Sequence, residues 1–450
     1  MLFKRARLGR RKTAAAAVLG LLLVGASGRP AYAEGMRAQQ WFLDAMKAEQ
    51  MWRTSTGKGI TVAVIDTGVD AENPDLKGQV LHGKNFAEGQ AGDERTDYDG
   101  HGTGMAGLIA GTGAADGGNG TFGPAPGAKI LPVRMPKSTT AANEAAAIQQ
   151  FNQVLPKAIR YAADAGAQVI NISMGAEQGS PDVTSAVKYA LEKGTLIFAG
   201  VGNSGDKGNP VEYPAATPGV VGVAAVGKDL RHTSWSEYGP QVDMSAPGAD
   251  MVAACTSVTG FCKTDGTSEA TAIASASAAL IWSKHPDWTN NQVLRVMLNT
   301  IGAPTDGAKR NDSIGYGIVR PRIALQNPGD PGPANVYPLP DLKDVASNPT
   351  PPKASQTAGA AAPARTDNST AASSSSGTDN TLWITLGLGA VVLLAAAITV
   401  AAVARRRRTT TAPFPTPHPA PRPSPYGTPG GAPSPYTPPV PPNSFPSSDR

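Results

Sequence analysis

Residues 60–68 read Ile-Thr-Val-Ala-Val-Ile-Asp-Thr-Gly. An apolar, β-branched run that ends at Asp66 and turns at Gly68 is typical of a fully buried strand. Four similar runs follow, at residues 129–135, 168–173, 195–201 and 220–226, and helical patterns lie between them, notably at 141–165 and 183–193. This alternation predicts an α/β fold, a mostly parallel sheet with helices on both faces.

Three polar residues occupy positions that neighbouring glycines keep clear. Asp66 ends the first strand, His101 stands in Asp-Gly-His-Gly-Thr-Gly before a small-residue helix, and Ser268 follows Gly-Thr before an alanine-rich run to residue 280. Taken singly, they fit a turn residue, a structural histidine and a helix N-cap. Together, an acid, an imidazole and a hydroxyl indicate nucleophilic catalysis at the carboxyl ends of the strands.

The three segments resemble the signature blocks of the subtilase family, in the chain order Asp, His, Ser. The resemblance extends over residues 40–326 and implies a serine endopeptidase that needs no cofactor, with Asp66, His101 and Ser268 as its triad. It also implies that Asn203, in Gly-Asn-Ser-Gly, stabilises the oxyanion, although such an asparagine also suits a plain turn. Ser173, Met174 and Gly175 resemble the segment that pairs with substrate and lines the primary specificity pocket.

Two residues depart from the family pattern. Gly104 replaces a frequent histidine, and Glu269 follows the nucleophile where a small or apolar residue is common. The charge of Glu269 suits a helix N-terminus and is expected to affect the pocket or the pKa of His101. An ordinary histidine pKa predicts that activity declines below about pH 6 to 7.

The two ends of the chain read as export and anchoring segments. Basic residues followed by an apolar run and Ala-Tyr-Ala predict a signal peptide at residues 1–33, with an uncleaved anchor as the alternative. The peptidase domain is expected at 34–330, with too few residues before Asp66 for a chaperone-like propeptide. A Pro-, Ala- and Ser-rich linker is expected at 331–381.

Residues 382–404 carry no charge and precede Arg405–Arg408, which predicts a transmembrane helix, with a buried core helix as the alternative. The domain would then lie outside the cell membrane, and the basic, Pro-rich tail, residues 405–450, in the cytoplasm. This layout, with Gln-Trp-Phe-Leu at 40–43, resembles the mycosins of type VII secretion systems. That resemblance implies secretion-system partners, and leaves a scaffold for a secretion complex as the alternative function.

Composition bears on other kinds of site. Cys255 and Cys262 are the only cysteines, and in an exported domain they are expected to form a disulfide, with two free thiols as the alternative. Positive charge concentrates in the terminal segments, so nothing indicates a nucleic-acid partner. Residues 116–120, Asp-Gly-Gly-Asn-Gly, fit a calcium loop or a plain glycine turn, and no cluster has zinc spacing.

Overall fold

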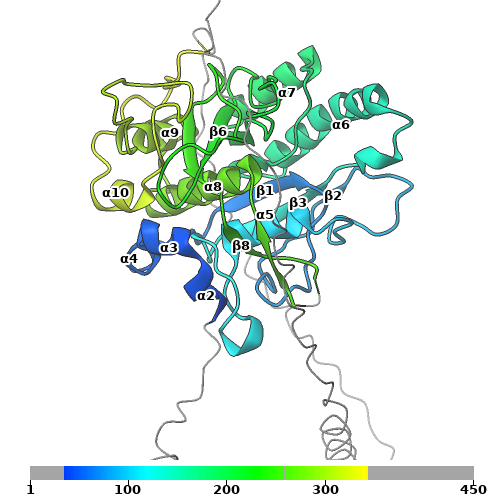
Figure 1. The fold of residues 1–450 in the computed structure, drawn as a ribbon, viewed down its shortest axis with the longest axis horizontal. Helices are drawn as coiled ribbons and strands as arrows, with labels where there is room; N and C mark the ends of the chain where they lie inside the picture. The colour runs from blue at the N-terminus through cyan, green and yellow to red at the C-terminus, as the bar shows by residue number, and fades with distance from the viewer. Residues whose placement is uncertain (1–34, 258, 343–450) are drawn as a thin grey trace, which may run out of the picture. The chain divides into compact units, whose positions relative to one another are not determined.

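The computed structural model describes residues 35–257 and 259–342. Seven parallel strands form its main sheet, in the order β2-β3-β1-β4-β5-β6-β7 (Figure 1). Their bounds are β1 Thr61–Asp66, β2 Lys84–Asn85, β3 Lys129–Arg134, β4 Val169–Ile172, β5 Leu196–Gly200, β6 Val221–Val226 and β7 Met244–Pro247. The five predicted strands are β1 and β3 to β6, and each observed end lies within one residue of its prediction.

Helices cover both faces of this sheet, as predicted (Figure 1). Along β1, Val62 and Val64 pack with α5 (His101–Ala110) and α8 (Thr267–Lys284), whereas Ala63 and Ile65 pack with α6 (Glu144–Asp164) and α7 (Pro181–Glu192). Successive side chains of a strand point to opposite faces, so one central strand contributes to two cores. Its buried pattern is continuous for this reason.

Local capping explains where two helices depart from the sequence expectation. Helix α6 starts at residue 144 rather than 141 because the Asn143 side chain accepts a hydrogen bond from the Ala146 N–H. Helix α7 starts at residue 181 rather than 183 because Ser180 caps it and Pro181 suits a first helical position. Hydrophobic periodicity marks the buried face of a helix, not its first turn.

Shorter elements complete the fold. Helices α2 (Met36–Gln39), α3 (Trp41–Met46) and α4 (Ala48–Trp52) precede the sheet, and α9 (Asn290–Asn299) and α10 (Pro321–Gln326) follow α8. The antiparallel hairpin of β8 (Met251–Ala254) and β9 (Phe261–Thr264) contains the expected disulfide between Cys255 and Cys262. Two short 3₁₀ turns, η1 (Ala115–Gly117) and η2 (Ser138–Thr140), lie in loops.

Gln40 ties the N-terminal helices to the domain. Its buried amide donates to the carbonyls of Phe122 and Val252, at 2.8 and 3.0 Å, and accepts from the Phe122 N–H at 2.9 Å. Phe42 and Leu43 are fully buried in the hydrophobic core to which α8 also contributes. The segment that resembles the mycosin N-terminus is therefore part of the packed structure.

Packing also continues beyond residue 330, where the sequence suggests that the linker begins. Arg295 donates to the carbonyls of Pro331, Pro333 and Val336, and the Asp341 carboxylate accepts from the Gly219 N–H at 2.7 Å. Leu339 is buried. The sequence does not reveal that residues 331–342 pack on the domain, because most of these contacts are made by backbone carbonyls, which every residue has.

The predicted membrane segments lie elsewhere in the chain. In residues 35–257 and 259–342, no helix has the length and apolar character needed to cross a bilayer. The signal peptide, residues 1–33, the span at 382–404 and the tail at 405–450 fall outside the described residues.

Residues 116–120, which the sequence suggests as a calcium loop or a glycine turn, lie in a loop whose two ends bind the Asp75 carboxylate. Asp75, 2% exposed, accepts from the Ala115 N–H with one oxygen and from the N–H and hydroxyl of Thr121 with the other, each at 2.8 Å. Within the described ranges, no group of three or more His, Cys, Asp or Glu side chains is placed to hold a metal ion. Structural calcium is therefore not shown here.

We expect Asp75→Ala to lower the free energy of unfolding by about 2–4 kcal/mol, because it removes three charge-assisted hydrogen bonds and leaves buried donors unpaired. Urea unfolding followed by tryptophan fluorescence would measure this. Glu88→Ala, which removes an exposed carboxylate, is the control and should change stability by less than about 0.5 kcal/mol. Equal transition midpoints for the two variants would contradict this account of the loop.

Candidate active site

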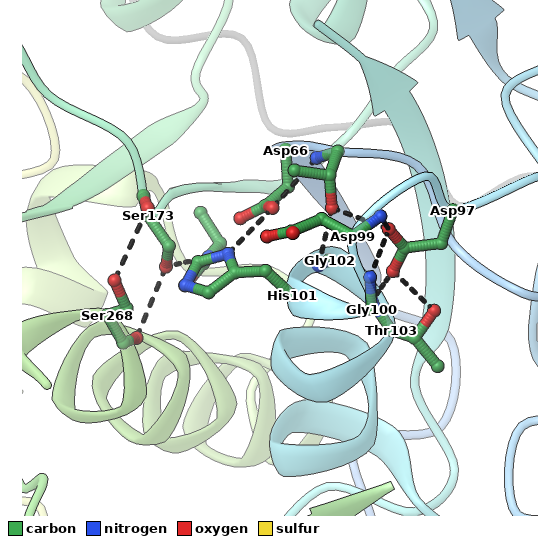
Figure 2. Close-up of polar contacts among 11 residues, drawn as sticks. Asp66, Asp97, Asp99, Gly100, His101, Gly102, Thr103, Ser173 and Ser268 are labelled. Carbon is green, nitrogen blue, oxygen red and sulfur yellow. Dashed lines mark hydrogen bonds and ion pairs between the residues drawn. The ribbon is translucent and has the colours of Figure 1, made fainter. Parts of the chain in front are cut away.

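Asp66 and His101 meet where β1 ends and α5 begins. The Asp66 carboxylate is fully buried and lies 2.8 Å from His101 Nδ1, while its same oxygen accepts from the Thr67 N–H at 2.8 Å (Figure 2). Gly102 allows the close approach, because a Cβ there would collide with the Gly68 carbonyl. The absence of a side chain at Gly102 thus lets the start of α5 pack directly against the backbone that follows β1.

Asp97, which sequence reasoning missed, holds the two sides of this contact in place. One carboxylate oxygen accepts from the Thr67 hydroxyl and the Gly100 N–H, at 2.7 and 2.8 Å, and the other from the N–H and hydroxyl of Thr103 (Figure 2). It therefore caps α5 and fixes the residue after Asp66. An acidic residue shortly before a helix start was the available signal.

Ser268 is the second residue of α8, a helix whose small side chains let it lie buried beneath the sheet. Its hydroxyl donates to the Ser173 carbonyl at 3.3 Å, and the Ser173 hydroxyl donates to the Ser268 carbonyl at 3.2 Å (Figure 2). Within the described residues, Ser268 makes this bond rather than one to His101. If Ser268 is the nucleophile, as predicted, its hydroxyl would have to rotate toward the imidazole, and catalytic hydrogen bonds are often not yet formed in unliganded sites.

Buried hydrogen bonds connect α8 to β4 behind Ser173. Asn171 donates from Nδ2 to the Ser173 hydroxyl and accepts from the Ser275 hydroxyl, both at 3.0 Å. Asn171 and Ser275 are fully buried, so each bond forms in a medium where leaving it unmade is costly. The network fixes the spacing between the start of α8 and the Ser173 segment.

Asn203 lies after β5 and faces the start of α8. Its Oδ1 accepts the Thr267 N–H at 2.9 Å, which orients the side-chain amide and leaves Nδ2 as a donor. The Ser268 N–H belongs to the first turn, where backbone donors lack intrahelical partners. Asn203 and the Ser268 N–H therefore both lie at the start of α8.

A cleft of about 530 Å³ runs beside these residues. His101, Ser173, Met174 and Gly175 line it, together with Glu177 and Glu212 at the same end. The structure thus brings the predicted triad, Asn203 and the Ser173 segment to one edge of the sheet. The sequence prediction did not identify Glu212, which lies 37 residues beyond Gly175 in the chain.

Carboxylates surround the imidazole and change its acidity. Asp66 raises the pKa of His101 from 6.5 to about 9, burial of the ring opposes this shift, and Glu269 and Asp97 add to it. Glu269 is itself buried, which raises its own pKa. The expected influence of Glu269 on the imidazole is therefore present, second to that of Asp66.

Comparison with known proteins agrees with this geometry. Residues 57–317 match the subtilase family. The chain belongs to the subtilase family. The major intracellular serine protease of Bacillus subtilis is 34% identical to this subtilase over 247 residues, which are 54% of the chain and 74% of the relative. The subtilase is thus a serine-type endopeptidase, as predicted, and such catalysis uses only protein groups.

Solved mycosins have the same fold as this subtilase. MycP1 from the ESX-1 type VII secretion system superposes with a TM-score of 0.58 at 27% identity, over 68% of this chain and 90% of MycP1. MycP3 from the ESX-3 system gives 0.56 at 32% identity, over 66% and 90% of the two chains. The predicted likeness to mycosins is confirmed.

The raised pKa of His101 changes the pH dependence expected from sequence. A base must be neutral to accept a proton, so we expect kcat/KM to increase through pH 7 and to level off only above about pH 9. Asp66→Asn should move this rise down toward pH 6.5 and lower kcat by about 10⁴-fold. A kcat/KM of the parent that is already independent of pH at pH 7 would contradict the raised pKa of His101.

The contribution of His101 to stability has the opposite pH dependence. Because the folded pKa lies above the unfolded value near 6.5, this contribution is fully present below pH 6.5 and is lost as pH rises through about 9. The protonation state that stabilises the fold is therefore the inactive one.

Proposed function

We propose that this subtilase is a membrane-anchored serine endopeptidase that cleaves extracytoplasmic proteins through an acyl-enzyme and works beside a type VII secretion system. The observation that carries the catalytic part is the buried contact between Asp66 and His101 next to Ser268. Because His101 Nδ1 is hydrogen-bonded to Asp66, Nε2 is the ring nitrogen that can accept a proton from Ser268.

In the proposed mechanism, Ser268 Oγ attacks a substrate carbonyl carbon while His101 Nε2 takes the hydroxyl proton. The imidazolium that forms is stabilised by Asp66 and then gives its proton to the departing amine as the peptide C–N bond breaks. Water next attacks the acyl-enzyme and gives its proton to the same nitrogen. The ester bond then breaks, and the proton returns to Ser268.

Asn203 and the Ser268 backbone N–H are proposed to stabilise the oxyanion. Because Thr267 holds Oδ1, Asn203 can direct Nδ2 toward the negative charge without reorganising. Ser173, Met174 and Gly175, on the cleft wall, are proposed to pair with the substrate backbone in an extended conformation.

Location and partners are proposed from the ends of the chain together with the mycosin likeness. The uncharged stretch 382–404 is long enough for one bilayer span, and Arg405–Arg408 would remain in the cytoplasm. MycP1 and MycP3 come from type VII secretion systems, so membrane components of such a system are the partners proposed here.

Asn203→Leu should lower kcat by about 10²–10³-fold with little change in KM, because its amide is proposed to bind charge that develops only in the transition state. This magnitude is the one known for the loss of such a donor in subtilisin, a member of the same family. Steady-state hydrolysis of a peptide substrate measures both constants. An equal loss in kcat/KM that arises from KM alone would contradict the oxyanion role.

Labelling by a fluorophosphonate probe tests the proposed nucleophile in the full-length chain. We expect the parent to be labelled and to cleave peptides, and Ser268→Ala to do neither, because the probe reacts with an activated serine. In cell fractions, the labelled protein should be found with membranes, and removal of residues 382–404 should release it. A folded parent that reacts with nothing would favour the alternative of a scaffold for a secretion complex.

A further inference from the structure

Two glycines on the cleft side of adjacent strands each face a glutamate. Gly175 follows β4 and Gly202 follows β5, which pair in parallel. A methyl group on Gly175 would collide with the carboxylate of Glu212, and one on Gly202 with that of Glu237. Both carboxylates therefore lie directly behind the two backbone segments that flank the start of α8.

Among the described residues, these carboxylates have no cationic partner. Glu237 is fully buried; one oxygen accepts from the Ser204 N–H at 3.3 Å and the other has no hydrogen-bond partner among the described residues. Glu212, half-buried, lines the cleft, and Glu177 lies at its exposed rim. No ion pair in the described part of the chain involves any of the three.

Burial makes this arrangement unfavourable without a cation. It raises the pKa of Glu212, with Glu177 adding to the effect, and it raises the pKa of Glu237 to about 7, with Glu212 adding. Removing charge from water costs free energy unless an opposite charge compensates. A positive group entering the cleft would find one carboxylate within contact and a second behind it.

The cleft wall also fits the stem of a long basic side chain. Met174 and Ala176 give apolar contact on either side of Gly175, and Glu212 lies beyond them. Lysine and arginine combine an apolar stem with a charged end, and arginine can bind a carboxylate through two hydrogen bonds. The Ser173 carbonyl is 3.3 Å from Ser268 Oγ, so the Gly175 wall lies beside the substrate residue under attack.

We infer that Glu212 determines specificity by binding a lysine or arginine whose carbonyl Ser268 attacks, so that this protease cleaves after basic residues. The inference rests on the proposed function, because it names the substrate class of that same site. Glu237 supports the negative potential from behind the Asn203 segment without touching substrate.

The test uses the full-length chain in detergent and peptides that differ only at the residue before the cleaved bond: arginine, its neutral isostere citrulline, or leucine. The parent should cleave the arginine peptide with a kcat/KM about 10- to 100-fold above that of the citrulline peptide. Glu212→Gln should bring this ratio close to one by slowing only the arginine peptide. Glu144→Gln, the same change at an exposed residue lining the cleft, should preserve the ratio.

The outcomes separate this inference from the proposed function. Equal kcat/KM values for the arginine and citrulline peptides, or an unchanged ratio in Glu212→Gln, would overturn the inference. Cleavage of the leucine peptide and fluorophosphonate labelling would in that case still support the proposed protease function. If no peptide were cleaved and no label attached, the proposed function would fail. Fluorescence anisotropy with Ser268→Ala would still test whether Glu212 binds a basic side chain. Equal Kd values for the arginine and citrulline peptides would refute the inference.

Discussion

The hydrogen bond between Asp66 and His101 Nδ1 joins the end of strand β1 to the start of helix α5, and the geometry of the site follows from it. Gly102 lets the start of α5 approach the Gly68 carbonyl closely, and Asp97 binds both Thr67 and the first turn of α5. A buried carboxylate stabilises a charged imidazole, so the ring that must be neutral to act as a base is held largely protonated near pH 7. Stability and activity therefore favour opposite protonation states of one residue.

Helix α8 provides the second constraint. It is buried along nearly its whole length, and only small side chains let a helix lie so close to a sheet. Thr271 and Ser277 hydrogen-bond to carbonyls within the helix. Ser275 hydrogen-bonds across to β4, where Asn171 connects it to Ser173. Packing in the middle of the helix thereby sets the position of its N-terminus, where Asn203 accepts the Thr267 N–H next to Ser268. A loop alone would not hold these groups with comparable accuracy.

The glutamates behind the cleft reflect a different balance. A protein that only needed a stable core would place apolar side chains against Gly175 and Gly202, since an unpaired buried carboxylate destabilises the fold. Here Glu212 and Glu237 occupy those positions without a cationic partner in the described structure. Such local conflicts with stability concentrate at sites that bind something, and the charge that relieves this one is positive. In this interpretation, a positively charged group of the substrate supplies the counter-charge that the described protein residues do not.

The sequence by itself determined the parallel sheet, five of its seven strands and the family, because continuous apolar runs and short glycine-flanked motifs depend on neighbours along the chain. It also indicated Asp66, His101, Ser268, Asn203 and the Ser173 segment, which the fold brings to one sheet edge. Only the tertiary structure decided the raised pKa of His101, the bracing by Asp97, the docking of residues 331–342 and the place of Glu212 in the cleft. Each of these depends on charge, burial or contact between residues distant in sequence, and such effects exist only once the chain has folded.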